Sequence, residues 1–324
     1  MNPWSPRSLL TTEGMPRAEI EGIFGRARLH ARGLRAGTPL RSLAGKVVAN
    51  LFFENSTRTR LSFERAAKAL GADVLNFNAS TSSVSKGETL VDTVRNVEAL
   101  GVTAVVLRHP ASGAAHLVSH HVRCAVVNAG DGTHAHPSQA LLDAYTLHER
   151  WGSLEGKTVA IVGDVLHSRV ARSNLYCLVT LGARVIIAGP PTLVPVGLEA
   201  MGATVVPSVD AAVEEADAVM MLRVQLERQK ESMFPTSREY ARAFGLTLGR
   251  AGLLKPGTVV MHPGPVNRGV ELSSDVVDGE RSVILDQVEA GVAVRMAVLE
   301  KLVQAGDRHR GARTAGDGNA TVVS

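Results

Sequence analysis

The sequence is poor in cysteine, in aromatic residues and in long apolar runs, and each scarcity excludes a class of protein. Only two of the 324 residues are cysteine, Cys124 and Cys177, so we expect neither a disulfide scaffold nor a structural zinc cluster. No apolar run approaches the roughly 18 residues of a membrane span, and residues 1–10 lack the apolar core of a signal peptide. We therefore expect a cytoplasmic protein with no membrane partner.

Positive charge is present but weakly patterned. The formal net charge is +4, aromatic residues are 4% of the chain, and no run of five Lys or Arg residues occurs. Nucleic-acid-binding surfaces usually combine clustered cations with aromatic rings that stack on bases. We therefore expect no nucleic-acid partner, and the mild basicity fits small anionic substrates instead.

Short apolar runs alternate with amphipathic segments along most of the chain. Strands are predicted at residues 47–53, 104–107, 125–128, 158–162, 184–188, 204–206, 218–222 and 259–261. Helices are predicted at residues 57–70, 141–150, 170–181 and 284–304. This alternation predicts an α/β fold with two doubly wound, parallel-sheet domains.

The predicted domain boundary lies near residue 151, where a helix gives way to polar turn residues. It separates a first domain, 1–150, from a second domain, 151–283, and the helix 284–304 closes the fold. Residues 306–324 are rich in Gly, Ala, Arg and polar side chains, and we expect a disordered tail there.

Familiar cofactor motifs are missing. The segment 152–158 has one residue too few between its glycines for a Walker loop, and it precedes its strand. The turn at 163–168 lacks two glycines of a dinucleotide fingerprint. The eleven histidines show no metal-ligand spacing, and no Gly-x-Ser-x-Gly elbow is present. We therefore expect no cofactor and no metal.

The most informative segment, 52–60, leaves a predicted strand and opens a predicted helix. A helix N-terminus offers free backbone N–H groups and the positive end of the helix dipole. The hydroxyls of Ser56, Thr57 and Thr59 and the guanidinium of Arg58 add further donors. The segment thus predicts a phosphate site that needs no metal. A capping role for Ser56 or Thr57 is the alternative, and it explains only one hydroxyl.

Three further segments of the first half carry polar side chains at predicted element ends. Lys86 lies in a Ser- and Gly-rich loop, where a solvated surface lysine is the alternative interpretation. Arg108 ends a strand, the position where ligands bind in open α/β sheets. His136 opens a helix with Gln139 one turn on, and helix capping is the alternative for His136.

The second half places cations in similar positions. Arg169 begins a predicted helix, where a cation opposes the helix dipole unless an anion offsets it. Arg223 and Gln225 follow a strand, and prolines give 262–265 an irregular backbone. Cations, one histidine and no covalent nucleophile together fit group transfer by positioning and electrostatics.

These segments, in this order and spacing, resemble the catalytic chains of the aspartate/ornithine carbamoyltransferase family. The resemblance covers about residues 9–304 and is carried by residues 53–60, 85–89, 108–110, 136–139, 163–173, 222–225 and 262–269. It implies transfer of the carbamoyl group of carbamoyl phosphate to the amine of L-aspartate, the committed step of pyrimidine synthesis. It also implies that the first domain binds carbamoyl phosphate, that the second binds aspartate, and that the C-terminal helix crosses back to the first domain.

The resemblance also implies roles for individual residues. The phosphate would be held by Ser56, Thr57, Arg58 and Thr59, and the carbamoyl oxygen by Arg108, His136 and Thr59. The carbamoyl amine would be held by Gln139 and the backbone around Pro263, Gly264 and Pro265. Aspartate would be bound by Lys86, Arg169, Arg223 and Gln225. Catalytic roles are implied for Arg58, Thr59, Lys86, Arg108 and His136.

In this family the loop that carries Ser82 and Lys86 comes from a neighbouring subunit. The resemblance therefore implies a homotrimer with shared active sites, open to larger assemblies with regulatory chains or a dihydroorotase. Glu54 matches a residue that bridges the two domains through an arginine.

Several alternatives remain open at this point. A member that uses ornithine would want carboxylates for a cationic side chain, whereas Arg223 suits an anionic one. Another amine could replace aspartate. A non-catalytic homologue should lack some of Arg58, Lys86, Arg108 and His136, but all four are present. A nucleotide-binding oxidoreductase lacks support because the glycine fingerprint is absent.

Overall fold

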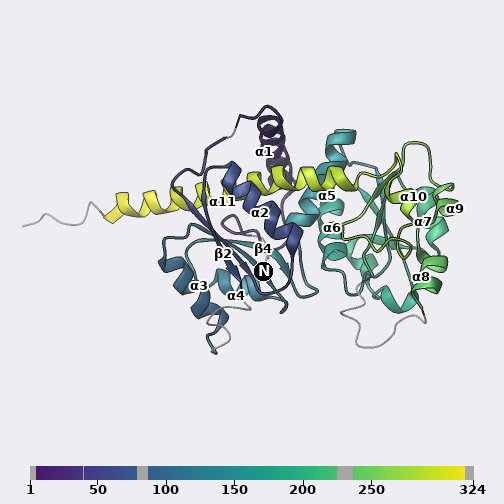
Figure 1. Ribbon diagram of the computed structural model, residues 1–324, viewed down its shortest axis with the longest axis horizontal. Helices are drawn as coiled ribbons and strands as arrows, with labels where there is room; N and C mark the ends of the chain where they lie inside the picture. Colours follow the sequence, from purple (N-terminus) through teal and green to yellow (C-terminus); the bar gives the residue numbers. More distant parts are fainter. Residues whose placement is uncertain (1–4, 39, 79–86, 225–235, 318–324) are drawn as a thin grey trace, which may run out of the picture.

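Two parallel β-sheets, each flanked by helices, make up the computed structural model of the chain (Figure 1). The structure describes residues 5–38, 40–78, 87–224 and 236–317. Of the residues singled out from the sequence, Ser82, Lys86 and Gln225 lie outside the described residues, as does the end of the expected tail, 318–324.

The first sheet has the strand order β2-β1-β3-β4, with all strands parallel. Its strands are β1 (Val47–Phe52), β2 (Asp73–Asn78), β3 (Ala104–His109) and β4 (Ala125–Asp131). Its helices are α1 (Arg17–Arg35), α2 (Thr57–Ala69), α3 (Leu90–Ala99), α4 (Ala114–Ser119) and α5 (Pro137–Trp151). The strand order reverses between β1 and β3, and ligands bind at the carboxyl ends of strands at such a point.

The second sheet has the order β7-β6-β5-β8-β9, again all parallel, and it reverses between β5 and β8. Its strands are β5 (Thr158–Val162), β6 (Arg184–Ala188), β7 (Ala203–Val205), β8 (Ala218–Met221) and β9 (Val259–Met261). Its helices are α6 (Arg169–Thr180), α7 (Val209–Glu215), α8 (Ser237–Phe244), α9 (Leu248–Ala251) and α10 (Ser274–Val277).

Alternate residues of the central strands enter different apolar clusters, because a parallel sheet is covered on both faces. On β1, Val48 and Phe52 belong to one cluster, and Ala49 and Leu51 belong to another. The first cluster continues to one face of the second sheet, where it includes Ile161 of β5. One core therefore joins the two halves and brings the carboxyl ends of their strands together.

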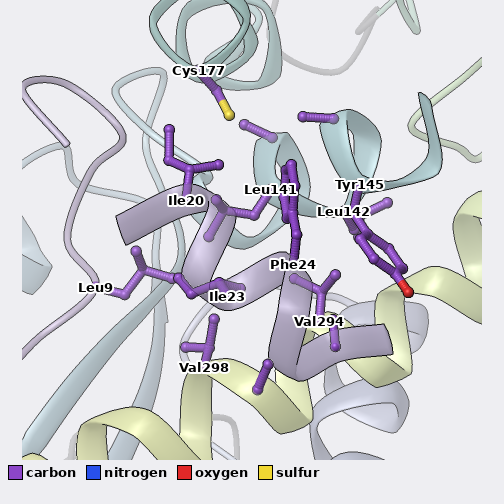
Figure 2. Close-up of a cluster of buried hydrophobic side chains, with 14 of the residues drawn as sticks. Leu9, Ile20, Ile23, Phe24, Leu141, Leu142, Tyr145, Cys177, Val294 and Val298 are labelled. Atoms are coloured by element: carbon purple, nitrogen blue, oxygen red, sulfur yellow. The ribbon is translucent and has the colours of Figure 1, made fainter. Parts of the chain in front are cut away.

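The long helix α11 (Ile284–Asp317) returns from the second half and contacts α1, α2 and α5 of the first (Figure 1). Figure 2 shows the apolar residues where α1, α5 and α11 meet. Phe24 of α1 lies at the centre of this contact, with its ring centroid 5.6 Å from that of Tyr145 on α5. Val294 and Val298 of α11 approach from the other side.

The predicted fold class is confirmed, including the returning C-terminal helix. The structure continues this helix beyond its predicted end at residue 304, to Asp317, and disorder of the tail stays a prediction. Asp307 pairs with Lys46 at 2.8 Å and ties this part of α11 to the start of β1. Among the described residues, no helix combines the length and apolar composition that a membrane span requires.

Candidate active site

A cavity of about 780 Å³ lies where the carboxyl ends of the strands of both sheets converge. Of the residues predicted from the sequence, it is lined by Ser56, Thr57, Arg58, Thr59, Arg108, His136, Gln139, Arg169, Arg223, Gly264 and Pro265. They lie at the end of one strand, β3, or in the segments and helix starts that follow β1, β4, β5, β8 and β9. The structure thus brings together every predicted site residue that it describes.

The charge of the cavity is strongly positive. Its charged lining residues are one glutamate, Glu54, and five arginines, Arg58, Arg108, Arg169, Arg223 and Arg295. Desolvation, together with the nearby charge of Arg223, lowers the pKa of Arg58. The arginines of this half-buried cavity repel one another, and a bound anion would offset that repulsion. The cavity therefore suits a ligand with several negative charges.

The N-terminus of α2 forms one wall of the cavity. Ser56 occupies the N-cap position, but its side chain makes no capping hydrogen bond, so the capping alternative does not account for its hydroxyl. Thr59, in the first turn of the helix, is buried. The free N–H groups of the first turn and these hydroxyls all belong to one segment, as a phosphate site requires.

Gly264 lets Arg58 approach the loop after β9. Its φ is +65°, and a Cβ atom there would lie 2.8 Å from Cζ of Arg58. The loop itself is held by His262, whose Nδ1 accepts from the Gly264 N–H at 2.7 Å and whose Nε2 lies 3.1 Å from Oε1 of Glu271. Glycine fits the left-handed backbone conformation here, and a Cβ atom would displace the Arg58 guanidinium.

His136 lies at the N-cap of α5, and its side chain makes no capping bond. Its backbone N–H donates to Oγ of Ser173 at 2.8 Å, and its buried Nδ1 has no hydrogen-bond partner in the part of the chain that the structure describes. Burial lowers its pKa well below the ordinary value, and the charges of Arg169, Arg108 and Arg295 act in the same direction. The imidazole is therefore neutral at neutral pH, with one N–H to donate.

Glu54 connects the two halves across the cavity. Its carboxylate accepts from both Nη atoms of Arg169, at 3.0 and 3.2 Å, and from Nη2 of Arg108 at 3.3 Å. Arg169 also donates to the carbonyl oxygen of Gly132 at 3.2 Å. Arg169, a cation at the start of α6, is therefore offset by an anion from the first half of the chain, Glu54.

Arg295 and Gln287 of α11 line the cavity but were not predicted. Arg295 is buried, its Nη1 donates to Oγ of Ser62 at 2.8 Å, and burial lowers its pKa to about 10. A lone charged residue inside the apolar stretch 290–299 was the available signal. Gln287 accepts the N–H of His262 through Oε1 at 3.0 Å.

One group of described side chains has the composition of a cation site: His116, Asp131 and His134 offer ligand atoms within 4.8 Å of one another. The Asp131 carboxylate already accepts several hydrogen bonds, from the backbone N–H groups of Gly113 and Ala135, from Nδ2 of Asn128 and from Nδ1 of His134. These bonds hold the loop between β4 and His136 in place. This structural role explains why a buried carboxylate lies here without invoking a metal.

Two family models match almost the whole chain. Residues 7–149 match the carbamoyl-P binding domain of aspartate/ornithine carbamoyltransferase, and residues 155–302 match its Asp/Orn binding domain. A catalytic subunit of aspartate carbamoyltransferase from Myxococcus xanthus is 65% identical over 294 residues, 91% of this chain and 98% of that protein. The corresponding subunit from Sorangium cellulosum is 58% identical, with 90% and 92% covered.

Solved structures agree with these sequence matches. Aspartate transcarbamoylase from Trypanosoma cruzi, in complex with N-(phosphonacetyl)-L-aspartic acid, superposes with a TM-score of 0.85 at 32% identity, covering 93% of this chain and 97% of that one. The same enzyme with carbamoyl phosphate and aspartate gives 0.84 at 33% identity, covering 92% and 97%. The resemblance seen in the sequence motifs is thereby confirmed, and the chain belongs to the aspartate/ornithine carbamoyltransferase family.

Proposed function

We propose that this chain transfers the carbamoyl group of carbamoyl phosphate to the amine of L-aspartate, giving N-carbamoyl-L-aspartate and phosphate. This is the committed step of pyrimidine synthesis, and we place it in the cytoplasm without a cofactor. The observation that carries the proposal is the cavity between the two sheets, whose described lining includes five arginines and a neutral His136. Carbamoyl phosphate and aspartate bring several negative charges, which such a cavity balances.

Each half of the chain has its own substrate. Residues 1–150, completed by the returning helix 284–304, bind carbamoyl phosphate, and the phosphate lies against Ser56, Thr57, Arg58 and Thr59. Residues 151–283 bind aspartate, whose two carboxylates are held by Arg169 and Arg223 with help from Gln225 and Lys86. The α2 N-terminus and the separate positions of the two arginines support this division.

The reaction needs no protein nucleophile, because the amine of aspartate attacks the carbamoyl carbon itself. Negative charge then develops on the carbamoyl oxygen, where Arg108, His136 and Thr59 donate hydrogen bonds. Gln139 and the backbone at Pro263, Gly264 and Pro265 hold the carbamoyl amine. The carbon–oxygen bond to phosphate breaks, and the departing phosphate takes the proton that the amine loses.

The active site is completed by Ser82 and Lys86 of a neighbouring subunit, so the working assembly is a homotrimer. Regulatory chains or a dihydroorotase are the partners of any larger assembly. Mixing two inactive variants, Arg108→Ala and Lys86→Ala, then restores activity, because some mixed sites contain both native residues. If the mixture stays as inactive as its components while subunits exchange, the shared site is wrong.

The activity is tested by phosphate release from carbamoyl phosphate with L-aspartate or L-ornithine as acceptor. Release with aspartate alone is expected. Release with ornithine alone would contradict the roles of Arg169 and Arg223, since a cationic side chain does not suit them. No release with either substrate, from a chain that sediments as a trimer, would contradict the catalytic proposal itself.

A further inference from the structure

Asp143 is a fully buried carboxylate directly behind the cavity, two turns into α5 from His136. Three side-chain amides converge on it. Its Oδ1 accepts from Nε2 of Gln139 at 2.9 Å and from Nε2 of Gln287 at 2.7 Å, and its Oδ2 accepts from Nδ2 of Asn174 at 2.8 Å. An ionised carboxylate is only an acceptor, so each amide must turn its NH₂ group toward Asp143.

Two of these amides are also held at a second point. Nδ2 of Asn174 donates to the carbonyl oxygen of Val170 at 3.1 Å, and Oε1 of Gln287 accepts from the backbone N–H of His262 at 3.0 Å. For Gln139, Asp143 is the only side-chain hydrogen-bond partner among the described residues. Because Gln139 lines the cavity, the end left for a ligand is its carbonyl oxygen, Oε1.

We propose that Asp143 is a positioning residue that fixes the Gln139 amide with Oε1 toward the substrate and thereby selects carbamoyl phosphate over acyl phosphates. The inference rests on the proposed function, in which Gln139 holds the carbamoyl amine. A carbamoyl group presents N–H donors to an acceptor oxygen, whereas the methyl group of acetyl phosphate presents none. If the amide were turned, its NH₂ would face the carbamoyl NH₂, and the preference would vanish.

The same carboxylate orders the other side of the cavity. Through Gln287 it holds the N–H of His262, the first residue of the loop 262–265. Burial raises the pKa of Asp143 to about 6, against the opposing effect of its three amide partners and of Arg295. At neutral pH the Asp143 carboxyl is therefore ionised, although its burial disfavours the charged form. The ionised carboxylate only accepts hydrogen bonds, and this orients the three amides.

Two double variants move the carboxylate without changing the charge, and they predict opposite results. In Asp143→Asn with Gln287→Glu, the new carboxylate on α11 can only accept hydrogen bonds, so the introduced asparagine must direct its NH₂ group toward it. Gln139 and residue 287 bond the same side of residue 143, so this NH₂ group also faces Gln139. The Gln139 amide then turns. In Asp143→Asn with Asn174→Asp, the asparagine NH₂ faces the new carboxylate on α6 instead, and its oxygen still accepts from Gln139. The second pair loses the bond to Val170 but keeps the orientation.

The readout is the ratio of the dissociation constant of acetyl phosphate to that of carbamoyl phosphate, measured by calorimetry. We expect D143N/Q287E to lower this ratio about tenfold, the equivalent of one hydrogen bond, and D143N/N174D to keep it within about twofold. Asp143→Leu, which releases the amide, also lowers the ratio and provides the readout if D143N/Q287E does not fold. Gln139→Leu removes the amide and shows how far the ratio falls when its contribution is lost completely.

Two results would overturn the inference: a folded D143N/Q287E or D143L that keeps the wild-type ratio, or a D143N/N174D that loses it equally. The latter would mean that any disturbance of the buried network has the same effect. Failure of the proposed function looks different, because wild-type protein would then neither bind carbamoyl phosphate nor transfer its carbamoyl group. A wild-type enzyme that is active but binds acetyl phosphate equally well contradicts only the role of Asp143.

Discussion

His136 is a cavity side chain whose protonation state decides what it can do. Burial and three neighbouring arginines lower its pKa well below the ordinary value. The neutral form predominates throughout the neutral pH range, and it donates a hydrogen bond without supplying a general base. A positive imidazolium would have been repelled by the same arginines that attract the substrates.

Replacement of His136 by alanine therefore lowers kcat by about 10²- to 10³-fold, the usual effect of removing one donor to a developing oxyanion. The shape of the kcat profile above pH 6 stays unchanged, because the lost group does not titrate there. His136→Gln, which keeps an N–H donor but has no titrating group, retains more activity than the alanine variant. Loss of a limb of the profile near pH 7 in the alanine variant would show that His136 acts as a base.

Gly264 is the residue on which the close approach of Arg58 depends. A Gly264→Ala change places a methyl group against the guanidinium and raises the KM for carbamoyl phosphate about tenfold, or about 1.4 kcal/mol of binding. Gly257→Ala is the matched control, because its φ is also positive, +82°, with no atom within 4 Å of the added Cβ. Both variants lose stability from backbone strain, and only the first should lose affinity.

At the scale of elements, the site depends on where helices begin and strands end. Each predicted cavity residue lies at the end of a strand, in the segment after a strand or in the first turn of a helix. Helix α11 has a different role, since it crosses both halves and contributes Gln287 and Arg295. It is tied to α1 by a buried pair, in which Nε2 of His30 lies 2.8 Å from Oε2 of Glu300.

This contact makes stability depend on pH. Burial lowers the pKa of His30 below its ordinary value of 6.5, although Glu300 acts in the opposite direction. Below pH 6.5 the unfolded chain therefore binds more protons at this position than the folded chain does. The stabilisation from a neutral His30 is present above pH 6.5 and is lost as the pH falls, by at most about 1.4 kcal/mol per pH unit.

The measurement is the free energy of unfolding by urea between pH 5 and pH 7.5, for wild type and His30→Gln. The wild type should lose more stability on acidification than the variant, because the glutamine cannot be protonated. His121→Gln, an exposed histidine, controls for the removal of an imidazole. Equal slopes for wild type and His30→Gln would show that burial of His30 does not favour its neutral form.

At the scale of the whole molecule, two of the ion pairs between residues 1–150 and residues 151–283 differ in burial. Glu54 and Arg169 face the cavity, with side chains 23% and 5% exposed. Arg17 and Glu155 lie on the surface, with side chains 44% and 63% exposed. Exposed pairs contribute little to stability, whereas removing one partner from a buried pair is costly.

Glu54→Gln should therefore lower the free energy of unfolding by about 2 kcal/mol, less than for a fully buried pair. It should also raise the KM for aspartate several-fold, because Arg169 loses the carboxylate that orients it across the cavity. Glu155→Gln removes the surface pair and should leave the KM unchanged. Equal effects of the two substitutions on KM would indicate that Glu54 has no special role in joining the halves.

The fold class and most of the cavity residues could be predicted from the sequence, because both depend on patterns a few residues long. Buried parallel strands appear as short apolar runs, and the segment 53–60 carries several cavity-lining side chains within a few residues. Helix α1 was missed because three glycines obscure its apolar stripe, although packing against α11 compensates for their low helix propensity. Strand β2 was missed because an edge strand with Asp and Asn residues lacks the continuous apolar run of a central one.

The contacts between residues far apart in the chain could not be predicted in this way. Glu54 and Arg169 are 115 residues apart, and Asp143 and Gln287 are 144 apart, so no local pattern predicts that they are bonded. The same holds for Arg295, whose place in the cavity depends on the path of α11 across both halves. Local chemistry is encoded in segments a few residues long, whereas the pairing of charges and amides depends on how the whole chain packs.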